Sequence, residues 1–340
     1  MYSRVAKEEA KTYKPNHMGI LQEQAVEVTS TLSKDKPLIQ NLIILPCHSI
    51  FAPELNTKIT NHNDEDTFAI GKDADNWIME SFQLESDDHL SFFKHLELSL
   101  VELHENIANS ALVISGGYTK SSIEKSESSS YLELAEAVGL LKNPYFKVGT
   151  NILLEEYARD SYENVLYGIC TFYKKFRRFP AKITIVGFGF KRERFLSSHL
   201  TTLGYYILPN VDNDELSMSS LPNTKHVKYV SAGPFLPAKP AGLTETEYEA
   251  YKDEFWGSLY KNERSKALDL FKSNPFGSNK SILHDKKLKR DPWNKREEVY
   301  SFYQTESDVL NSLVEIDKFD IKNAWNIYQK KVLPEFPLYE

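Results

Sequence analysis

The sequence predicts an α/β protein: a Rossmann-like, three-layer α/β/α domain with a mainly parallel sheet, followed by a helical C-terminal extension. Short, continuous apolar runs are typical of strands that are buried on both faces of such a sheet. They alternate with longer segments in which apolar residues recur every three or four positions, as on one face of a helix. Four such strand and helix units follow one another in residues 37–235, and this alternation favours a parallel sheet.

The first unit follows a polar N-terminal extension, residues 1–36, in which only a short helix near residues 20–28 is expected. The apolar run at residues 42–45 ends at a proline and predicts a central strand. After a loop over residues 52–75, the spacing of apolar side chains across residues 75–109 predicts one or two amphipathic helices.

The second and third units show the same order of elements. Residues 111–114 predict a buried strand, and the Ser-Gly-Gly turn at 115–117 lets the backbone bend without Cβ clashes. A helix over about 127–141 and a strand at 151–155 follow. Asp160-x-x-Glu163 is a capping-box variant, which predicts that the next helix begins there.

The fourth unit consists of a strand at residues 182–188 and a short helix that Gly204 ends. Two later strands are expected, at 205–210 and 226–232.

Helices dominate the last third of the sequence. After a proline-rich linker, residues 236–340 predict a helical region packed on the α/β domain, with a long helix that Thr244-x-x-Glu247 caps and that runs through Phe271. The last helix is expected around residues 320–332. The lysine-rich segment 284–296 predicts a solvated basic turn.

Composition narrows the class of protein. The net charge of −7 shows no basic excess, which argues against a nucleic-acid partner. The two cysteines, Cys47 and Cys170, lie in apolar runs and are expected to be buried free thiols. The N-terminus has no apolar signal region, and no run reaches the roughly 20 apolar residues of a transmembrane helix. We therefore expect a soluble, cytoplasmic protein without a transmembrane segment.

The candidate site lies where the strands end, because ligands of open parallel sheets bind beyond the carboxyl ends of the strands. Hydroxyls, glycine amides and cations follow these ends and suit an anionic ligand. The expected ligand-binding residues are His48, Ser115, Gly116, Gly117, Thr119, Asp160, Asn164, Lys191 and Arg194. Two carboxylates, Glu127 and Glu156, are the candidates for moving a proton or gripping a ribose.

Each of these features also has an ordinary structural explanation. The glycines can serve simple chain reversal, and Asp160 with Glu163 can serve helix capping. Lys191 and Arg194 stand at a helix start, where cations are disfavoured unless they meet an anion or form salt bridges to Glu156 or Asp160.

Two further groups and the known cofactor motifs give little support for a metal or cofactor. His199 is expected to be packed or on the surface rather than a ligand. The cluster at residues 62–66 matches no calcium or zinc motif, so no metal site is expected. Neither G-x-G-x-x-G nor G-x-x-x-x-G-K-[ST] occurs at the strand ends, which leaves the cofactor unassigned.

Four segments in order, "LIILPCHSI", "LVISGGYTK…SESSSYLELA", "LLEEYARDSYENVLYGI" and "ITIVGFGFKRERFLSSHL", resemble the DUF218 (YdcF/SanA/ElyC-like) family. The later "NPFG…LKRDPWN" is similar to its fungal branch. This resemblance implies a Rossmann-like fold and a shared cleft that includes Ser115, Gly116, Gly117, Glu127, Glu156, Asp160, Asn164, Lys191 and Arg194. It implies no particular reaction, although one relative is reported to bind S-adenosylmethionine. Many relatives have a glycine after the first strand, where this chain has Cys47-His48, which is expected to narrow the pocket floor.

Two function classes follow from these observations. The first is an enzyme, a hydrolase or transferase that acts on a phosphorylated or nucleotide-like small molecule held by the strand-end loops. The second is a non-catalytic ligand-binding or scaffold protein that binds, for example, S-adenosylmethionine.

Overall fold

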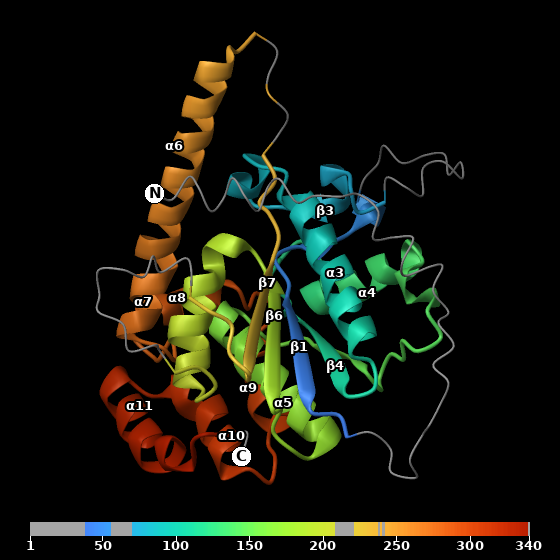
Figure 1. The fold of residues 1–340 in the computed structure, drawn as a ribbon. Coiled ribbons are helices and arrows are strands. Elements are labelled where there is room, and N and C mark those ends of the chain that lie inside the picture. Colours follow the sequence, from blue (N-terminus) through green and yellow to red (C-terminus); the bar gives the residue numbers. More distant parts are fainter. Residues whose placement is uncertain (1–37, 56–69, 208–220, 237–238, 240–241, 339–340) are drawn as a thin grey trace.

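The computed structural model describes residues 38–55, 70–207, 221–236, 239 and 242–338. The predictions for residues 1–36 and for the cluster at 62–66 lie outside this part of the chain. A five-stranded parallel sheet with the order β5-β4-β1-β6-β7 forms the centre of the molecule (Figure 1). Its strands are β1 (Asn41–Pro46), β4 (Ser110–Ser115), β5 (Ile152–Glu155), β6 (Lys182–Gly187) and β7 (Val227–Ser231). A separate antiparallel pair consists of β2 (Ile50–Phe51) and β3 (Trp77–Ile78).

Strand β1 lies in the middle of the sheet. It pairs with β4 from Asn41 opposite Ser110 to Pro46 opposite Ser115, and with β6 on its other side. Both faces of β1 are covered, so its apolar run is continuous rather than alternating. Because all five strands are parallel, their carboxyl ends meet at one edge of the sheet.

Helices cover both faces of the sheet and complete the predicted three layers (Figure 1). Leu42 and Ile44 point to one face and share a core with α5 (Ser161–Phe176) and the π-helical segment η7 (Arg194–Leu200). Ile43 and Leu45 point to the other face and pack with α3 (Asp88–Glu105) and α4 (Glu127–Ala137). Cys47 and Cys170 are buried free thiols, as predicted.

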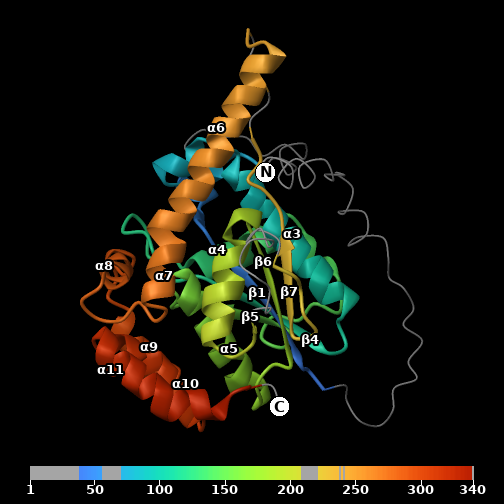
Figure 2. The same ribbon diagram turned by 60° about the vertical axis from the view of Figure 1, so that its left-hand side comes forward.

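The C-terminal region is helical, as predicted. Its elements are α6 (Glu245–Glu263), the π-helical η9 (Arg264–Leu268), α7 (Asp269–Ser273), α8 (Ile282–Lys289), α9 (Arg296–Phe302), α10 (Asp308–Glu315), η10 (Ile316–Lys318), α11 (Ile321–Ile327), the π-helical η11 (Tyr328–Val332) and η12 (Leu333–Glu335). Helices α7 to α11 gather on the α5 side of the sheet, whereas α6 extends away from the body (Figure 2). Phe276, Tyr303 and Leu310 belong to the same apolar core as α5.

Local capping patterns were confirmed. The Asp160 side chain accepts the Glu163 amide at the start of α5, and Thr244 and Glu247 cap α6 reciprocally. Gly204 has φ +76° after η7, in the left-handed region that glycine favours. No helix in the described ranges is both long and apolar enough to cross a bilayer.

Two segments differ from their predicted structure. Residues 75–87 contain no α-helix: the short 3-10 helices η3 (Ala74–Asn76) and η4 (Ser81–Leu84) flank β3, and α3 begins only at Asp88. Trp77 pairs with Phe51 and donates its indole N–H to Gly71, so its burial in this hairpin outweighs the helical spacing. The strand predicted at 205–210 is absent over residues 205–207, because the Tyr205 and Tyr206 amides bond to Leu200 O and finish the helix turn; residues 208–210 lie outside the described part of the chain.

The lysine-rich segment 284–296 is not the solvated turn that its charge suggested. Much of it lies in α8, where Lys287 is only 1% exposed. The Lys287 ammonium lies 3.0 Å from Glu163, 3.6 Å from Asp317 and 3.8 Å from Asp160. Three carboxylates compensate the buried charge, which a charge count along the sequence does not reveal.

Candidate functional site at the carboxyl edge of the sheet

The diglycine turn after β4 brings two loops into close contact. The Gly116 and Gly117 amides donate to Glu155 O and Ala158 O, while the Glu127 and Ser128 amides donate back to Gly117 O and Gly116 O. A Cβ on Gly117 would stand 2.8 Å from Ala158 O. These amides therefore join the β4 and β5 loops to each other, and glycine is needed for the close approach.

Ser115 and Asn164 lie beneath this turn in the interior. The Ser115 hydroxyl donates to Glu155 Oε2 at 2.5 Å, and Asn164 Nδ2 donates to Ser115 O at 3.0 Å. Glu155 also accepts from the Tyr157 and Ala158 amides and from the Tyr303 hydroxyl. Burial raises the pKa of Glu155 to about 7. Glu155, which was not among the predicted site residues, is thus the buried acceptor that organises this end of the sheet.

Glu127 stands at the first position of α4 and is 8% exposed. Thr119 Oγ1 donates to its carboxylate. Burial raises the pKa of Glu127, while the Thr119 hydrogen bond and the charges of Arg290, Lys120 and Lys191 act in the opposite direction. Glu127 therefore lies in the field of cations that come from three separate parts of the chain.

Glu156 has a different set of neighbours. Its carboxylate accepts from the hydroxyl of Ser126, the N-cap of α4. After burial, the charge of Glu156 is the main cause that raises the pKa of Tyr118. The two candidate carboxylates thus lie at the same place: Glu127 is the first residue of α4, and Glu156 binds the N-cap of that helix.

Lys191 and His48 face each other from the ends of β6 and β1. Lys191 Nζ lies 3.5 Å from His48 Nδ1 and 4.7 Å from the centroid of the Phe188 ring. No carboxylate among the described residues forms an ion pair with this ammonium. Burial, then Arg194, lower the pKa of Lys191 to about 8. Burial and the charge of Lys191 also lower the pKa of His48, so the imidazole is neutral and can accept a hydrogen bond from the Lys191 ammonium.

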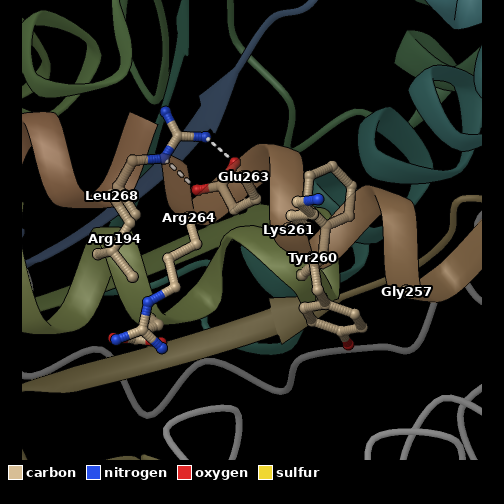
Figure 3. A pocket seen from close by; sticks show the side chains of 10 residues that line it. Arg194, Gly257, Tyr260, Lys261, Glu263, Arg264 and Leu268 are labelled. Atoms are coloured by element: carbon tan, nitrogen blue, oxygen red, sulfur yellow. Dashed lines mark hydrogen bonds and ion pairs between the residues drawn. The ribbon is translucent and has the colours of Figure 1, made fainter. Parts of the chain in front are cut away.

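Arg194 forms the salt bridge that its position predicted, but with another partner. Its guanidinium binds Glu263 of α6 through Nε at 2.7 Å and Nη2 at 3.1 Å (Figure 3), rather than Glu156 or Asp160. Its Nη1 donates to the Ser161 hydroxyl at 2.6 Å. Asp160 serves instead as the N-cap of α5, beside Lys287.

His199 is packed in the interior, as expected. It is fully buried, and its Nε2 lies 2.8 Å from Ser161 Oγ.

The C-terminal region adds residues that the strand-end analysis missed. Arg290 Nη1 donates to Arg159 O at 3.2 Å, and Trp293 Nε1 donates to Lys120 O at 2.9 Å. Both lie in the "LKRDPWN" segment. The resemblance of that segment to the fungal DUF218 branch was the sequence signal that could have pointed to these two residues. Glu263 carried no such signal, because it sits in an ordinary polar helix.

The edge therefore divides into two parts. One part holds the backbone in place through internal hydrogen bonds, and it consists of Ser115, Gly116, Gly117, Asn164 and the N-cap Asp160. The other, which we call the cationic part, contains Lys191, Arg194 and Arg290 together with His48 and Glu127. Within the described ranges, no group of three or more histidine, cysteine, aspartate or glutamate side chains could hold a metal ion.

Comparisons with known proteins give a relative but no activity. No family model matches the chain. The chain is 29% identical over 287 residues to an uncharacterized protein of Saccharomyces cerevisiae, an alignment that covers 75% of this chain and 84% of the yeast protein. No solved structure matches the chain. The likeness thus spans most of both proteins and is to a protein without an assigned function.

Proposed function

We propose that this is a DUF218-type protein that binds a phosphorylated or nucleotide-like small molecule at the cationic part of the carboxyl edge. The observation that carries the proposal is the Lys191 ammonium, which is partly buried, faces His48 and has no carboxylate partner among the described residues. A buried cation is costly unless an opposite charge compensates it. A phosphate group would supply that charge.

The surroundings of Lys191 support an anion with more than one charge. Arg194 and Arg290 both lower the pKa of Lys191 and of His48, so their positive fields overlap there. Overlapping fields of partly desolvated cations attract phosphates more strongly than isolated surface charges do.

Catalysis by such a site would fall to Glu127. Its pKa is raised by burial, and it stands in the field of the same cations, so it is suited to pass a proton to or from a bound phosphate ester. A hydrolase or transferase is the reaction class that this arrangement serves. Glu156 would then be the outer of the two carboxylates.

The second candidate is a binding protein without turnover, for example one for S-adenosylmethionine. One observation favours it: the Ser115 hydroxyl and the Gly116 and Gly117 amides are all bonded within the protein. The turn then contributes no donors that could stabilise a developing negative charge.

Calorimetric titration with inorganic phosphate, pyrophosphate, ATP and S-adenosylmethionine tests the proposal. We expect at least one phosphate compound to bind, and Lys191→Ala to weaken it about 10- to 100-fold, since a hydrogen bond to a charged group contributes about 1.5–3 kcal/mol. Lys147→Ala, which removes an exposed lysine before β5, is the control and should leave the affinity unchanged.

Turnover then separates the two classes. Release of phosphate or transfer of a group from the bound compound, abolished in Glu127→Gln, would support an enzyme. A compound that binds and is recovered intact would support the binding protein. Failure of every phosphate compound to bind would contradict the proposal.

A further inference from the structure

The guanidinium of Arg194 is held in the geometry with which arginine binds phosphates and carboxylates. Two of its nitrogens meet the two oxygens of Glu263, and the third donates to Ser161. The side chains of Arg194 and Glu263 are 10% and 9% exposed. This two-pronged pairing is strong and selective for planar or tetrahedral oxyanions. Glu263 therefore occupies, on Arg194, the place of an anionic group.

The helix that supplies Glu263 is only lightly attached. Apart from the Glu263 side chain at its end, the residues of α6 are exposed or half-buried, and the helix extends away from the body (Figures 1 and 2). Glu263 is its last residue, and the π-helical η9 starts immediately afterwards. Arg194 is likewise the first residue of the π-helical η7. Such segments contain an extra residue per turn and are frequent at functional sites.

A hollow of about 340 Å³ opens beside this ion pair, and Figure 3 shows the side chains around it. Phe190 and Tyr260 form its aromatic walls, Lys261 and Arg264 add positive charge, and the carboxylate of Glu193, which is paired with Lys272, also lines it. An anionic group could therefore approach Arg194 from this side while an attached ring contacts the aromatic walls.

The charges around the pair leave Glu263 outnumbered. Lys191 is close enough to Arg194 and Arg290 for both to lower its pKa, while Glu263 and Asp88 act in the opposite direction. After burial, the charges of Arg290 and Arg194 also lower the pKa of Lys286. The cations Lys191, Arg194, Arg290 and Lys286 thus outnumber the carboxylates Glu263 and Asp88. A ligand with two or more negative charges would therefore gain more from this cluster than Glu263 does.

We propose that Glu263 is a built-in competitor of the ligand: its carboxylate fills the fork of Arg194, and a phosphate group of the ligand replaces it there and releases the end of α6. This inference rests on the proposed anion site. It makes the C-terminal region a regulator of that site, because the ligand must displace a segment of the same chain before it binds fully. The apparent affinity is then reduced by the fraction of molecules in which Arg194 is occupied by Glu263.

Titration of the full chain with pyrophosphate and ATP, in the wild type and in Glu263→Gln, tests the competition. The glutamine keeps one hydrogen-bond acceptor and removes the charge, so we expect the dissociation constant to fall by about tenfold. Glu254→Gln, an exposed glutamate of the same helix, is the matched control and should bind like the wild type.

Hydrogen exchange of the wild type provides a readout that needs no variant. Saturation with ATP should speed the exchange of amides in residues 257–268, because the end of α6 is released. Binding that is equal or weaker in Glu263→Gln, or unchanged exchange in this segment, would overturn the inference and leave the anion site standing. Absence of binding in both the wild type and Glu263→Gln would overturn the anion site and the inference together.

Discussion

Lys191 is the residue on which the chemistry of this edge depends. It reaches its place because β6 ends at Gly187 and the following turn, η6 (Gly189–Lys191), points it back across the end of β1 toward His48. Burial and neighbouring arginines make its ammonium easier to deprotonate, which lowers its pKa to about 8. The charge that an anion would need is therefore present at neutral pH and is lost in a mildly alkaline range.

Anion affinity should consequently decline as the pH rises through about 8, because deprotonated Lys191 attracts no phosphate. Calorimetry between pH 7 and 9.5 measures this decline. Lys191→Arg keeps its charge throughout this range and should show a flat profile. The same lowered pKa makes the free energy of unfolding rise with pH between about 8 and the ordinary value of 10.5, since the unfolded chain binds the proton more tightly there. An equal decline of affinity in Lys191→Arg would contradict this role.

At the scale of elements, the loops after β4 and β5 behave as one unit. The backbone of Gly116 and Gly117 forms hydrogen bonds to the loop after β5. The Glu155 carboxylate accepts hydrogen bonds from Ser115 at the end of β4 and from Tyr157 in the loop after β5. Neither glycine has a positive φ, so their small size rather than their conformational freedom is what the fold uses. The loops can then present Glu127 and Thr119 at a constant position.

Gly117→Ala should destabilise the protein by about 1–3 kcal/mol, because its methyl group would meet Ala158 O and force the two loops apart. Gly257→Ala serves as the contrast. Gly257 lies within α6 with open space around it, so alanine there should add up to about 1 kcal/mol of stability. Chemical denaturation of both variants measures the difference. A Gly117→Ala protein as stable as the wild type would show that the loops are not in tight contact.

At the scale of the whole molecule, the C-terminal helices share the charges and the core of the α/β domain. Arg159 and Glu163 of the domain form a buried network with Lys287 and Asp317. The Tyr303 ring stacks on Tyr167 at a centroid distance of 4.9 Å, and its hydroxyl reaches Glu155. Removal of one partner from such a network leaves a buried charge uncompensated, at a cost of about 3–5 kcal/mol.

A chain that ends at residue 235 should therefore fail to fold cooperatively, although it would contain the whole parallel sheet. Arg159 and Glu163 would lose Lys287 and Asp317, and the apolar side of α5 would be exposed. Thermal unfolding followed by circular dichroism, with the full chain as reference, measures this. A cooperative transition in the shortened chain would show that residues 236–340 are a separable addition.

Much of this architecture could be predicted from local patterns. The apolar run at residues 42–45, the capping residues Asp160 and Thr244, and the glycine at 204 act over a few residues, so sequence spacing is enough to recognise them. Trp77 was misjudged because helical spacing and a buried hairpin place apolar residues similarly, and only the contact with Phe51 decides between them.

Local patterns of apolar, capping and turn residues were enough to predict the layers of this protein, the order of its units and the edge at which its polar loops gather. Which polar groups remain available at that edge depends on tertiary contacts, because the hydrogen bonds and ion pairs there join residues 40 to 173 positions apart. Ser115 was drawn inward by Glu155, Arg194 was paired with Glu263, and Lys287 was buried among carboxylates. Lys191 has no carboxylate in an ion pair with it among the described residues, and Arg194 has the largest effect of any single charge on its pKa.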